Sequence, residues 1–513
     1  MTMLNAMKNA SNYTRTENGA LTHKTTQSDL LDMFAMGAAM RKRTDADVIL
    51  MFRKAFKENP VYALKCLFYI RDVRGGQGER RFFRVIIHDM AAHADTREAI
   101  KRNLKFVPEF GRWDDLYAFE GTPLMTDALD LIKHQLAEDV QTNMPSLCAK
   151  WIPSENASSA DTKRLGNMTR KHLGMTHKEY RKVLSALRTR INVLEKLMSE
   201  GKWDQIEFDK IPSKAGLMYK KAFARHDLER TQNKNVQSYA DFAKDETKSV
   251  NAGTLYPYEV VEKAINLMGS ESYGWWNRNN KPVGMDNTDR LMINKYWDNL
   301  TDYFNGANLN ALAVVDTSGS MHGTPINVAT SLGLYCAERA GGPFANHYIS
   351  FSSRPQLIEC EGVDFCDKVD RIVRTNLCEN TNLEATFDLL LNTALQNRLA
   401  PGDLPQNIIV ISDMEFDAAT GNRTYYWETT PKFQPDTLLE GIAKKWANAG
   451  YEMPHLIFWN VQARQANIPM LGNGRISYVS GFSPSIFQTI MTGKSGYELM
   501  MECLDGERYA VIQ

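Results

Sequence analysis

The sequence of 513 residues lacks the marks of several classes of protein. No apolar run reaches the roughly 18 residues that a membrane-spanning helix needs, so no contact with a membrane is expected. Residues 1–24 are polar and contain no apolar stretch of the kind found in a signal peptide. The seven cysteines are odd in number and show no CxxC spacing, which argues against a disulfide framework or a structural zinc site. These absences predict a cytoplasmic location, and a place in a virion is the alternative.

Motifs of the common enzyme classes are also missing. The chain contains no GxSxG, HExxH or Walker-type loop. Metal-dependent phosphoryl transfer is disfavoured because the run at Asp316 reads Asp-x-Ser, where aspartyl-phosphate phosphatases have Asp-x-Asp. We therefore expect a protein that is not an enzyme.

The net charge is zero, but the charges are unevenly placed along the chain. Residues 163–225 contain 16 Lys and Arg against 6 Asp and Glu. Residues 311–513 contain 14 Lys and Arg against 22 Asp and Glu. The middle of the chain is therefore basic and its C-terminal part acidic, which predicts different partners for the two parts.

Residues 28–307 are predicted to be helical. Val48, Ile49, Phe52 and Phe56 form one apolar stripe at helical spacing. Polar, glycine-containing breaks such as residues 71–78 separate such stretches. Paired helices joined by short polar turns are typical of an α-solenoid of the HEAT type, although no exact repeat is present. Residues 1–27, ahead of the first stripe, are expected to form a flexible N-terminal arm.

From residue 308 to residue 513 the pattern changes to alternating strands and helices. Short β-rich apolar runs occupy residues 311–315, 347–351, 408–411 and 456–459, with helical stretches at residues 326–339, 383–395 and 437–449. This alternation predicts a doubly wound parallel sheet with helices on both faces. The fold class predicted for the whole chain is therefore α + α/β, and a ligand is expected at the carboxyl ends of the strands.

Polar side chains follow two of these predicted strands. The run Asp316-Thr-Ser318-Gly-Ser320 comes directly after the first strand, and Asp413 follows the strand at residues 408–411. Thr381, ahead of a predicted helix, offers a third hydroxyl. Oxygen ligands of this kind suit Mg²⁺ or Mn²⁺. The alternative is that Asp316 and the serines only cap a helix.

These five residues resemble the MIDAS motif of von Willebrand factor A (vWA) domains. The resemblance implies that Ser318 and Ser320 bind the ion directly, that Thr381 binds it directly or through water, and that Asp316 and Asp413 act mostly through water. It also implies an open coordination position that takes an acidic group from a protein partner.

Three upstream segments resemble the TROVE module of Ro autoantigen-type proteins and, more closely, an uncharacterised family of bacterial and large-virus proteins. They are residues 67–80 with Arg71-Asp72-Val-Arg74-Gly75-Gly76, residues 110–116 with Gly111-Arg112-Trp113-Asp114-Asp115, and residues 214–227. The resemblance implies a ring of helical repeats closed by the vWA domain, with RNA bound on a basic outer surface and single-stranded ends in the centre.

The basic middle of the chain supplies candidate RNA contacts, because any phosphate backbone requires a concentration of Lys and Arg. The candidates are Lys163, Arg164, Arg170, Lys171, Arg181, Lys182, Arg188, Arg190, Lys214, Lys220, Lys221 and Arg225. Tyr180 and Tyr219 lie among them and could stack on bases. The alternative is a set of solvated helix faces whose aromatic side chains point into the core.

For residues 71–81, the glycines and arginines could cradle a phosphate. A structural turn, in which Asp72 pairs with an arginine, is the favoured interpretation because the glycines follow a helix and not a strand. The leading hypothesis is an RNA-binding ring or horseshoe scaffold. The alternative is a metal-dependent protein-interaction module, which includes a structural or assembly component of a phage or virus.

Overall fold

The computed structural model describes residues 12–232, 236–268, 285–306, 309–351, 354–375, 381–418, 437–465, 467–470, 475–490 and 494–513. A small hairpin precedes a long helical part, and a six-stranded sheet with its own helices follows. The predicted fold class, α + α/β, is confirmed. The predicted domain boundary at residues 307 and 308 lies outside the described residues.

The helical part begins with short, closely packed helices. Its elements are α2 (Asp29–Met36), α3 (Asp45–Glu58), α4 (Pro60–Arg71), α5 (Arg80–Ala92), α6 (Ala94–Arg102), α7 (Val107–Phe110), α8 (Met125–Gln141), α9 (Cys148–Trp151), α10 (Ala160–His172), α11 (His177–Arg190), α12 (Leu194–Ser199), α13 (Ser213–Arg225), α14 (Asp227–Thr231), α15 (Tyr239–Lys244), α16 (Pro257–Met268) and α17 (Asn287–Asp298). Helices α2 to α6 each contact the next in sequence order, as in a solenoid.

Local sequence signals set where several of these helices begin. Thr44 starts α3 with a capping box in which its hydroxyl and the Asp47 carboxylate satisfy each other's backbone amides. Asn59 caps α4, and Pro60 takes the first helical position, where a missing amide costs nothing. Thr176 and Glu179 form a second capping box at the start of α11.

The C-terminal part is a doubly wound sheet with the strand order β5-β4-β3-β6-β7-β8. Its strands are β3 (Ala311–Asp316), β4 (His347–Phe351), β5 (Gln356–Glu359), β6 (Asn407–Ser412), β7 (His455–Asn460) and β8 (Ile476–Ser480). Its helices are α18 (Thr324–Arg339), α19 (Phe365–Thr375), α20 (Leu383–Asn397), α21 (Leu438–Asn448), α22 (Ile486–Ile490) and α23 (Gly496–Asp505). All pairings are parallel except that of the edge strand β5, which makes the sheet mixed.

Both faces of this sheet are buried, but against different parts of the chain. In β3, Leu312 and Val314 belong to the core that includes α2 to α11, whereas Ala313 and Val315 belong to the core that includes α13 to α18. Successive strand side chains point to opposite faces, so one strand serves both cores. This explains why the strands appear in the sequence as continuous apolar runs.

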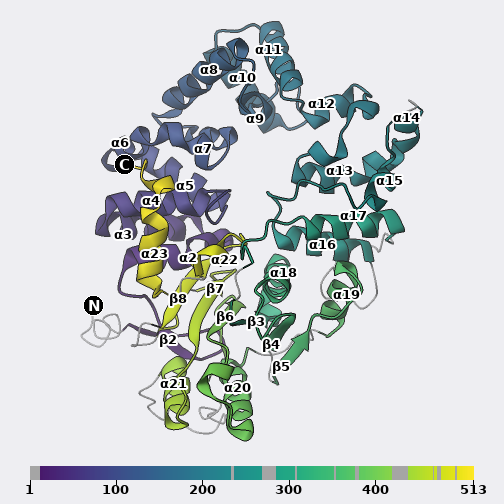
Figure 1. The fold of residues 1–513 in the computed structure, drawn as a ribbon. Coiled ribbons are helices and arrows are strands. Elements are labelled where there is room, and N and C mark those ends of the chain that lie inside the picture. The colour runs from purple at the N-terminus through teal and green to yellow at the C-terminus, as the bar shows by residue number, and fades with distance from the viewer. Residues whose placement is uncertain are drawn as a thin grey trace.

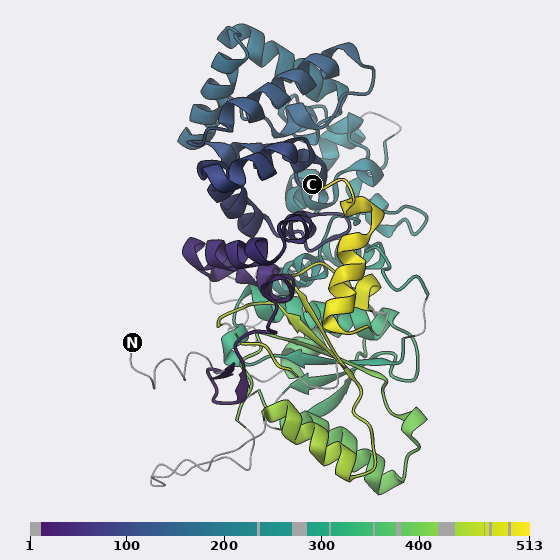
Figure 2. The same ribbon diagram turned by 90° about the vertical axis from the view of Figure 1, so that its left-hand side faces the viewer.

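The helices form an arc that closes on the sheet part (Figure 1). At one end, α2 contacts β8 and α23; at the other, α16 contacts α18 and α19. Figure 1 shows α8 to α11 at the point of the arc farthest from the sheet, and in Figure 2 the purple-to-blue helices rise from the sheet part in sequence order. Of the two predicted shapes, ring and horseshoe, the described elements match the ring, because they make a closed loop (Figure 1).

The expectation of a flexible arm over residues 1–27 is wrong for residues 12–27. Strands β1 (Tyr13–Arg15) and β2 (Leu21–His23) form an antiparallel hairpin. This N-terminal hairpin bridges to Asp417 and Ile468 of the C-terminal part. The backbone ladder and the burial of Ala20 hold it in place, and neither contact has a signal in the local sequence.

Candidate metal centre and basic surface

The predicted metal residues Asp316 and Asp413 lie at the carboxyl ends of two neighbouring strands. Asp316 is the last residue of β3 and Asp413 follows β6 directly. The two strands are parallel, with Val315 opposite Ile411, so their ends meet at one edge of the sheet. Both carboxyl groups are buried, with exposures of 0% and 1%.

The hydroxyls of the Asp-x-Ser-x-Ser run lie beside these carboxylates. The Oγ atoms of Ser318 and Ser320 are 3.0 Å apart. Ser320 also donates to Asp413, and the amide of Ser318 donates to Asp316 Oδ1 at 2.9 Å. The structure therefore brings together four of the five predicted residues around one point at the edge of the sheet.

Thr381, the fifth residue, is engaged elsewhere. It is fully buried, and its hydroxyl donates to the backbone oxygen of Glu415 at 3.1 Å. The Thr381 hydroxyl oxygen also accepts a hydrogen bond from Asn18 Nδ2 at 3.0 Å. Its contacts therefore place Thr381 between the Glu415 backbone and the N-terminal hairpin.

The two carboxyl groups have little compensating positive charge. Burial raises the pKa of Asp316, and repulsion from Asp413 raises it further. Burial also raises the pKa of Asp413. Asp413 Oδ2 has no hydrogen-bond partner among the described residues, and a guanidinium nitrogen of Arg464 lies 4.0 Å away from it. Buried, unpaired oxygens of this kind are costly unless a cation or a donor satisfies them.

These residues fit a hard divalent cation. Two carboxylates and two hydroxyls present oxygen atoms, which Mg²⁺ and Mn²⁺ prefer. The described part of the chain contains no group of three or more His, Cys, Asp or Glu that could hold a metal. An ion at this edge would therefore depend on the serine hydroxyls as much as on the carboxylates.

Two residues that sequence reasoning did not place at this site border it. Glu415 is buried, and its carboxylate accepts hydrogen bonds from the Glu17 amide at 2.6 Å and from Asn467 Nδ2 at 2.9 Å. Arg464 pairs with the Glu17 carboxylate at 2.9 Å. The position of Glu415, two residues after Asp413, is the only local sequence signal for either residue.

The twelve predicted RNA contacts divide into three groups. One is buried: Lys220 is 3% exposed and pairs with Asp289, so it cannot reach a ligand at the surface. Arg164, Arg170, Arg181, Arg188, Arg190 and Lys214 bind carboxylates or backbone oxygens of this chain. Lys163, Lys171, Lys182, Lys221 and Arg225 are exposed, with no polar partner among the described residues.

The aromatic residues in this region differ in their availability. Tyr180 is 1% exposed and donates to the Pro153 carbonyl, so it belongs to the core. Tyr219 is half-buried and its hydroxyl donates to Glu195. An additional lysine, Lys178, is exposed on α11, three and four residues before Arg181 and Lys182. This spacing places the three cations on one face of the helix.

The glycine-rich turn at residues 71–78 is structural. Arg71 is 1% exposed and pairs with Asp115 at 2.7 Å. Asp72 accepts hydrogen bonds from Arg508 and Tyr509. Asp115 accepts a hydrogen bond from the Arg112 amide at the start of the short helix Trp113–Phe119. Arg71 is therefore used inside the protein, whereas Arg74 and Arg80 are exposed.

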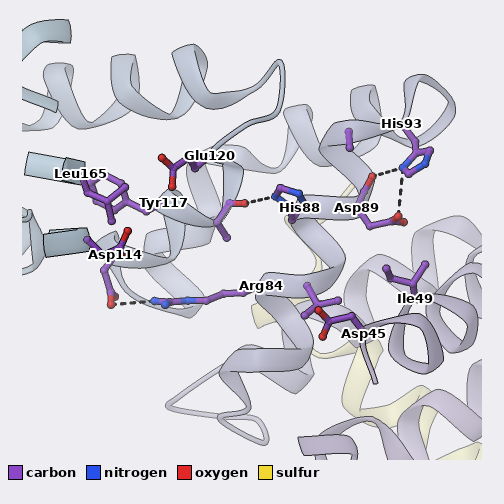
Figure 3. A pocket seen from close by; sticks show the side chains of 14 residues that line it. Asp45, Ile49, Arg84, His88, Asp89, His93, Asp114, Tyr117, Glu120 and Leu165 are labelled. Atoms are coloured by element: carbon purple, nitrogen blue, oxygen red, sulfur yellow. Dashed lines mark hydrogen bonds and ion pairs between the residues drawn. The ribbon is translucent and has the colours of Figure 1, made fainter. Parts of the chain in front are cut away.

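An open groove of about 560 Å³ lies between α3, α5, α10 and residues 114–120 (Figure 3). Asp89, Asp114 and Glu120 line it, and each pairs with an arginine of this chain. His88 contacts the Ala118 carbonyl at 2.9 Å. Arg164 also pairs with Asp161, another lining residue, so these carboxylates are engaged in ion pairs within the chain.

Comparison with known proteins places the chain in a family. A family described as a domain of unknown function, DUF2828, matches residues 16–116 and 134–305, more than half of the chain. The chain belongs to the DUF2828 family. A second domain of unknown function, DUF7788, matches residues 310–508, so the two matches meet where the helical part gives way to the sheet.

This DUF2828 chain is 28% identical over 524 residues to uncharacterized protein L728 of Acanthamoeba polyphaga mimivirus, covering 94% of this chain and 85% of the relative. The predicted relation to a large-virus protein is confirmed by this match. The crystal structure of the Ro (RSR) protein of Deinococcus radiodurans is similar over 94% of this chain and 100% of that one, at 14% identity and a TM-score of 0.48. In the described residues, every helix is too short or too polar to span a bilayer.

Proposed function

We propose that this protein is a non-catalytic binding scaffold whose C-terminal part is a vWA-type domain holding one divalent cation, Mg²⁺ or Mn²⁺. The observation that carries the proposal is Asp413 Oδ2, a buried carboxylate oxygen without a hydrogen-bond partner among the described residues. It lies beside a second buried carboxyl group, that of Asp316. The two carboxyl groups repel each other when both are charged, and a bound cation would offset that repulsion.

Asp316, Ser318, Ser320 and Asp413 would hold the ion, with Thr381 as an outer residue that positions the neighbouring loop. Because the two hydroxyls are neutral ligands, an ion at this edge keeps an attraction for anions. The ion would supply the charge with which the domain captures an acidic side chain of a partner protein.

A Mn²⁺ titration followed by electron paramagnetic resonance tests this proposal. We expect one Mn²⁺ site in the wild-type chain and its loss in Asp413→Asn, with a strong weakening in Ser320→Ala. Glu452→Gln, which removes an exposed carboxylate of the same domain, is the matched control and is expected to bind as wild type does. Unchanged Mn²⁺ binding in Asp413→Asn would refute the site.

A second candidate function is the binding of RNA by the helical part. The observation that favours it is the unpaired charge of Lys178 and Lys182 on one face of α11, together with exposed Lys163 and Lys171 on α10. Neighbouring lysines without partners repel one another. A phosphate backbone neutralises their charges, and the counterions released on binding add to the affinity.

RNA binding is tested with single-stranded and hairpin RNA over a range of salt concentrations. The double variant Lys178→Gln/Lys182→Gln is expected to bind more weakly, whatever the RNA sequence, with a smaller salt dependence. The control is Lys54→Gln/Lys57→Gln, which removes two exposed lysines from one face of α3. Equal losses in both variants, or no binding by the wild type, would exclude a specific basic surface on α11.

A further inference from the structure

The tip of the N-terminal hairpin reaches the same edge of the sheet as the candidate ion residues. The Glu17 amide donates to Glu415 Oε2 at 2.6 Å, and Asn18 Nδ2 donates to the Glu415 carbonyl at 2.6 Å. Asn18 also donates to Thr381 Oγ1 at 3.0 Å. Glu415 stands two residues after Asp413, so the tip of the hairpin is fastened to the loop that carries an ion residue.

The rest of the hairpin is docked as firmly as its tip. Thr16 donates to the Phe416 carbonyl at 2.5 Å, and Thr22 donates to the Ile468 carbonyl at 3.1 Å. Ala20 and Thr16 are 2% and 5% exposed. Ile468 and His23 also exchange backbone hydrogen bonds. A segment that merely crossed the surface of the domain would leave its side chains exposed and its backbone amides bonded to water.

A chain of three charges connects the hairpin with the ion residues. The Glu17 carboxylate pairs with Arg464 Nη2 at 2.9 Å. Arg464 Nη1 lies 4.0 Å from Asp413 Oδ2, the oxygen that lacks a hydrogen-bond partner. The backbone carbonyl of Arg464 is itself held by Arg43 at 2.6 Å. The positive charge nearest to the unpaired oxygen is thus shared with a carboxylate that the hairpin supplies.

We propose that the N-terminal hairpin is the internal partner of the metal face. Its Glu17 carboxylate occupies the approach that an acidic group of another protein would use, and hairpin docking and ion binding favour each other. The inference rests on the proposed function, because it assigns the first occupant of that same site. An external acidic partner then has to displace Glu17 before it can be captured.

The sign of the coupling follows from the charges. Arg464 repels a cation that approaches Asp413, and Glu17 offsets that repulsion by neutralising Arg464. Removing the Glu17 charge leaves Arg464 uncompensated, so the ion binds more weakly. Because coupling between two binding events is reciprocal, an ion that binds better with the hairpin docked must also hold the hairpin more firmly.

Hydrogen–deuterium exchange of residues 12–25, measured with and without Mn²⁺ on the full chain, tests the coupling. We expect Mn²⁺ to slow exchange about fivefold or more in the wild type. Glu17→Gln keeps the backbone hydrogen bonds of the hairpin and removes only the charge. It is expected to lose most of the slowing and to bind Mn²⁺ about fivefold more weakly. Glu98→Gln, at an exposed glutamate on α6, should behave as wild type.

Competition is tested with acetate as a simple carboxylate probe of the Mn²⁺-loaded chain. Asn18→Ala loosens the tip of the hairpin without removing an ion residue. Acetate is therefore expected to change the water relaxation of bound Mn²⁺ at lower concentration in Asn18→Ala than in wild type. If the two chains require the same acetate concentration for this change, the hairpin does not occupy the approach to the ion.

The outcomes separate the two proposals. If the wild type binds no Mn²⁺, the proposed function and this inference fall together. A second outcome is that Mn²⁺ binds to the wild type and is lost in Asp413→Asn, while Mn²⁺ does not slow the exchange of residues 12–25 and Glu17→Gln binds Mn²⁺ as the wild type does. That outcome refutes only the inference about the hairpin. Circular dichroism checks that Glu17→Gln is folded. We expect it to fold, because the substitution leaves the backbone hydrogen bond of residue 17 intact.

Discussion

Arg508 donates a hydrogen bond to each carboxylate oxygen of Asp72 and so ties the last turn of the chain to the glycine-rich turn of the helical part. Asp72 is fully buried, and Tyr509 adds a third side-chain hydrogen bond at 3.0 Å. The contact joins the end of the sheet part to one end of the helical arc. This charge pair is therefore one of the contacts that hold the helical arc against the sheet part.

Arg508→Met is expected to destabilise the protein because it leaves the Asp72 charge buried without a cation. We expect a loss of about 2–3 kcal/mol in the free energy of unfolding, below the cost of breaking a fully buried pair because Arg508 is partly exposed. Urea unfolding measures the change. Lys494→Met, which breaks an exposed pair with Glu502, is the control and should cost about 1 kcal/mol or less.

Gly76→Ala is expected to disrupt the same turn. A Cβ atom on Gly76 would lie 2.0 Å from the Tyr69 carbonyl oxygen, and backbone cannot move aside as a side chain can. The expected loss is about 3 kcal/mol, at the upper end of the range for overpacking. Gly402→Ala, where a Cβ meets open space, should change the unfolding midpoint little. A stable Gly76→Ala chain would contradict the structural role of the glycines.

The stability supplied by Asp115 should depend on pH in the acid range. Burial raises the pKa of Asp115, but the charges and hydrogen bonds of Arg71 and Arg84 lower it more, so the pKa lies below its usual value. A depressed pKa gives stability that is present above the unfolded pKa, about 3.9, and is lost as the pH falls through the folded pKa. The stability difference between wild type and Asp115→Asn should therefore be constant down to about pH 4 and shrink below it.

Mg²⁺ and Mn²⁺ should stabilise the wild-type chain against heat. A ligand that binds only the folded state adds about 2.7 kcal/mol at a concentration of 100 times its Kd. Thermal unfolding with and without Mn²⁺, and with EDTA as the reversal, measures the shift. In Asp413→Asn the melting temperature should be the same in Mn²⁺ and in EDTA, and a shift as large as that of the wild type would point to another site.

Asp316, Asp413 and the two serines were found in the sequence because they follow apolar runs. Asp316 and Asp413 are predictable neighbours since parallel strands end at the same edge of a sheet. The role of Thr381 as an ion ligand was harder to predict, because a position before a helix does not set the direction of the hydroxyl. The involvement of Glu17 and Arg464 could not be predicted, because contacts between distant segments leave no pattern in either segment alone.

The basic segment, residues 163–225, likewise shows some features that the sequence predicts and others that only packing decides. Its charge was countable in the sequence, but the tertiary structure decided that Lys220 is buried against Asp289. It also decided that Arg188 holds the backbone of residues 149–152 while Lys178 and Lys182 face solvent. Composition gives the amount of charge in a segment, whereas only packing separates the charges available to a ligand from those used inside.

The sequence by itself determined the helical and α/β halves, the positions of four of the six strands in the described sheet and the oxygen-rich edge, because periodicity and turn chemistry act over neighbouring residues. The tertiary structure alone decided that the helical arc closes on the sheet and that the N-terminal hairpin docks beside Asp413. These contacts depend on shape and charge matching between surfaces that meet only after each part has folded.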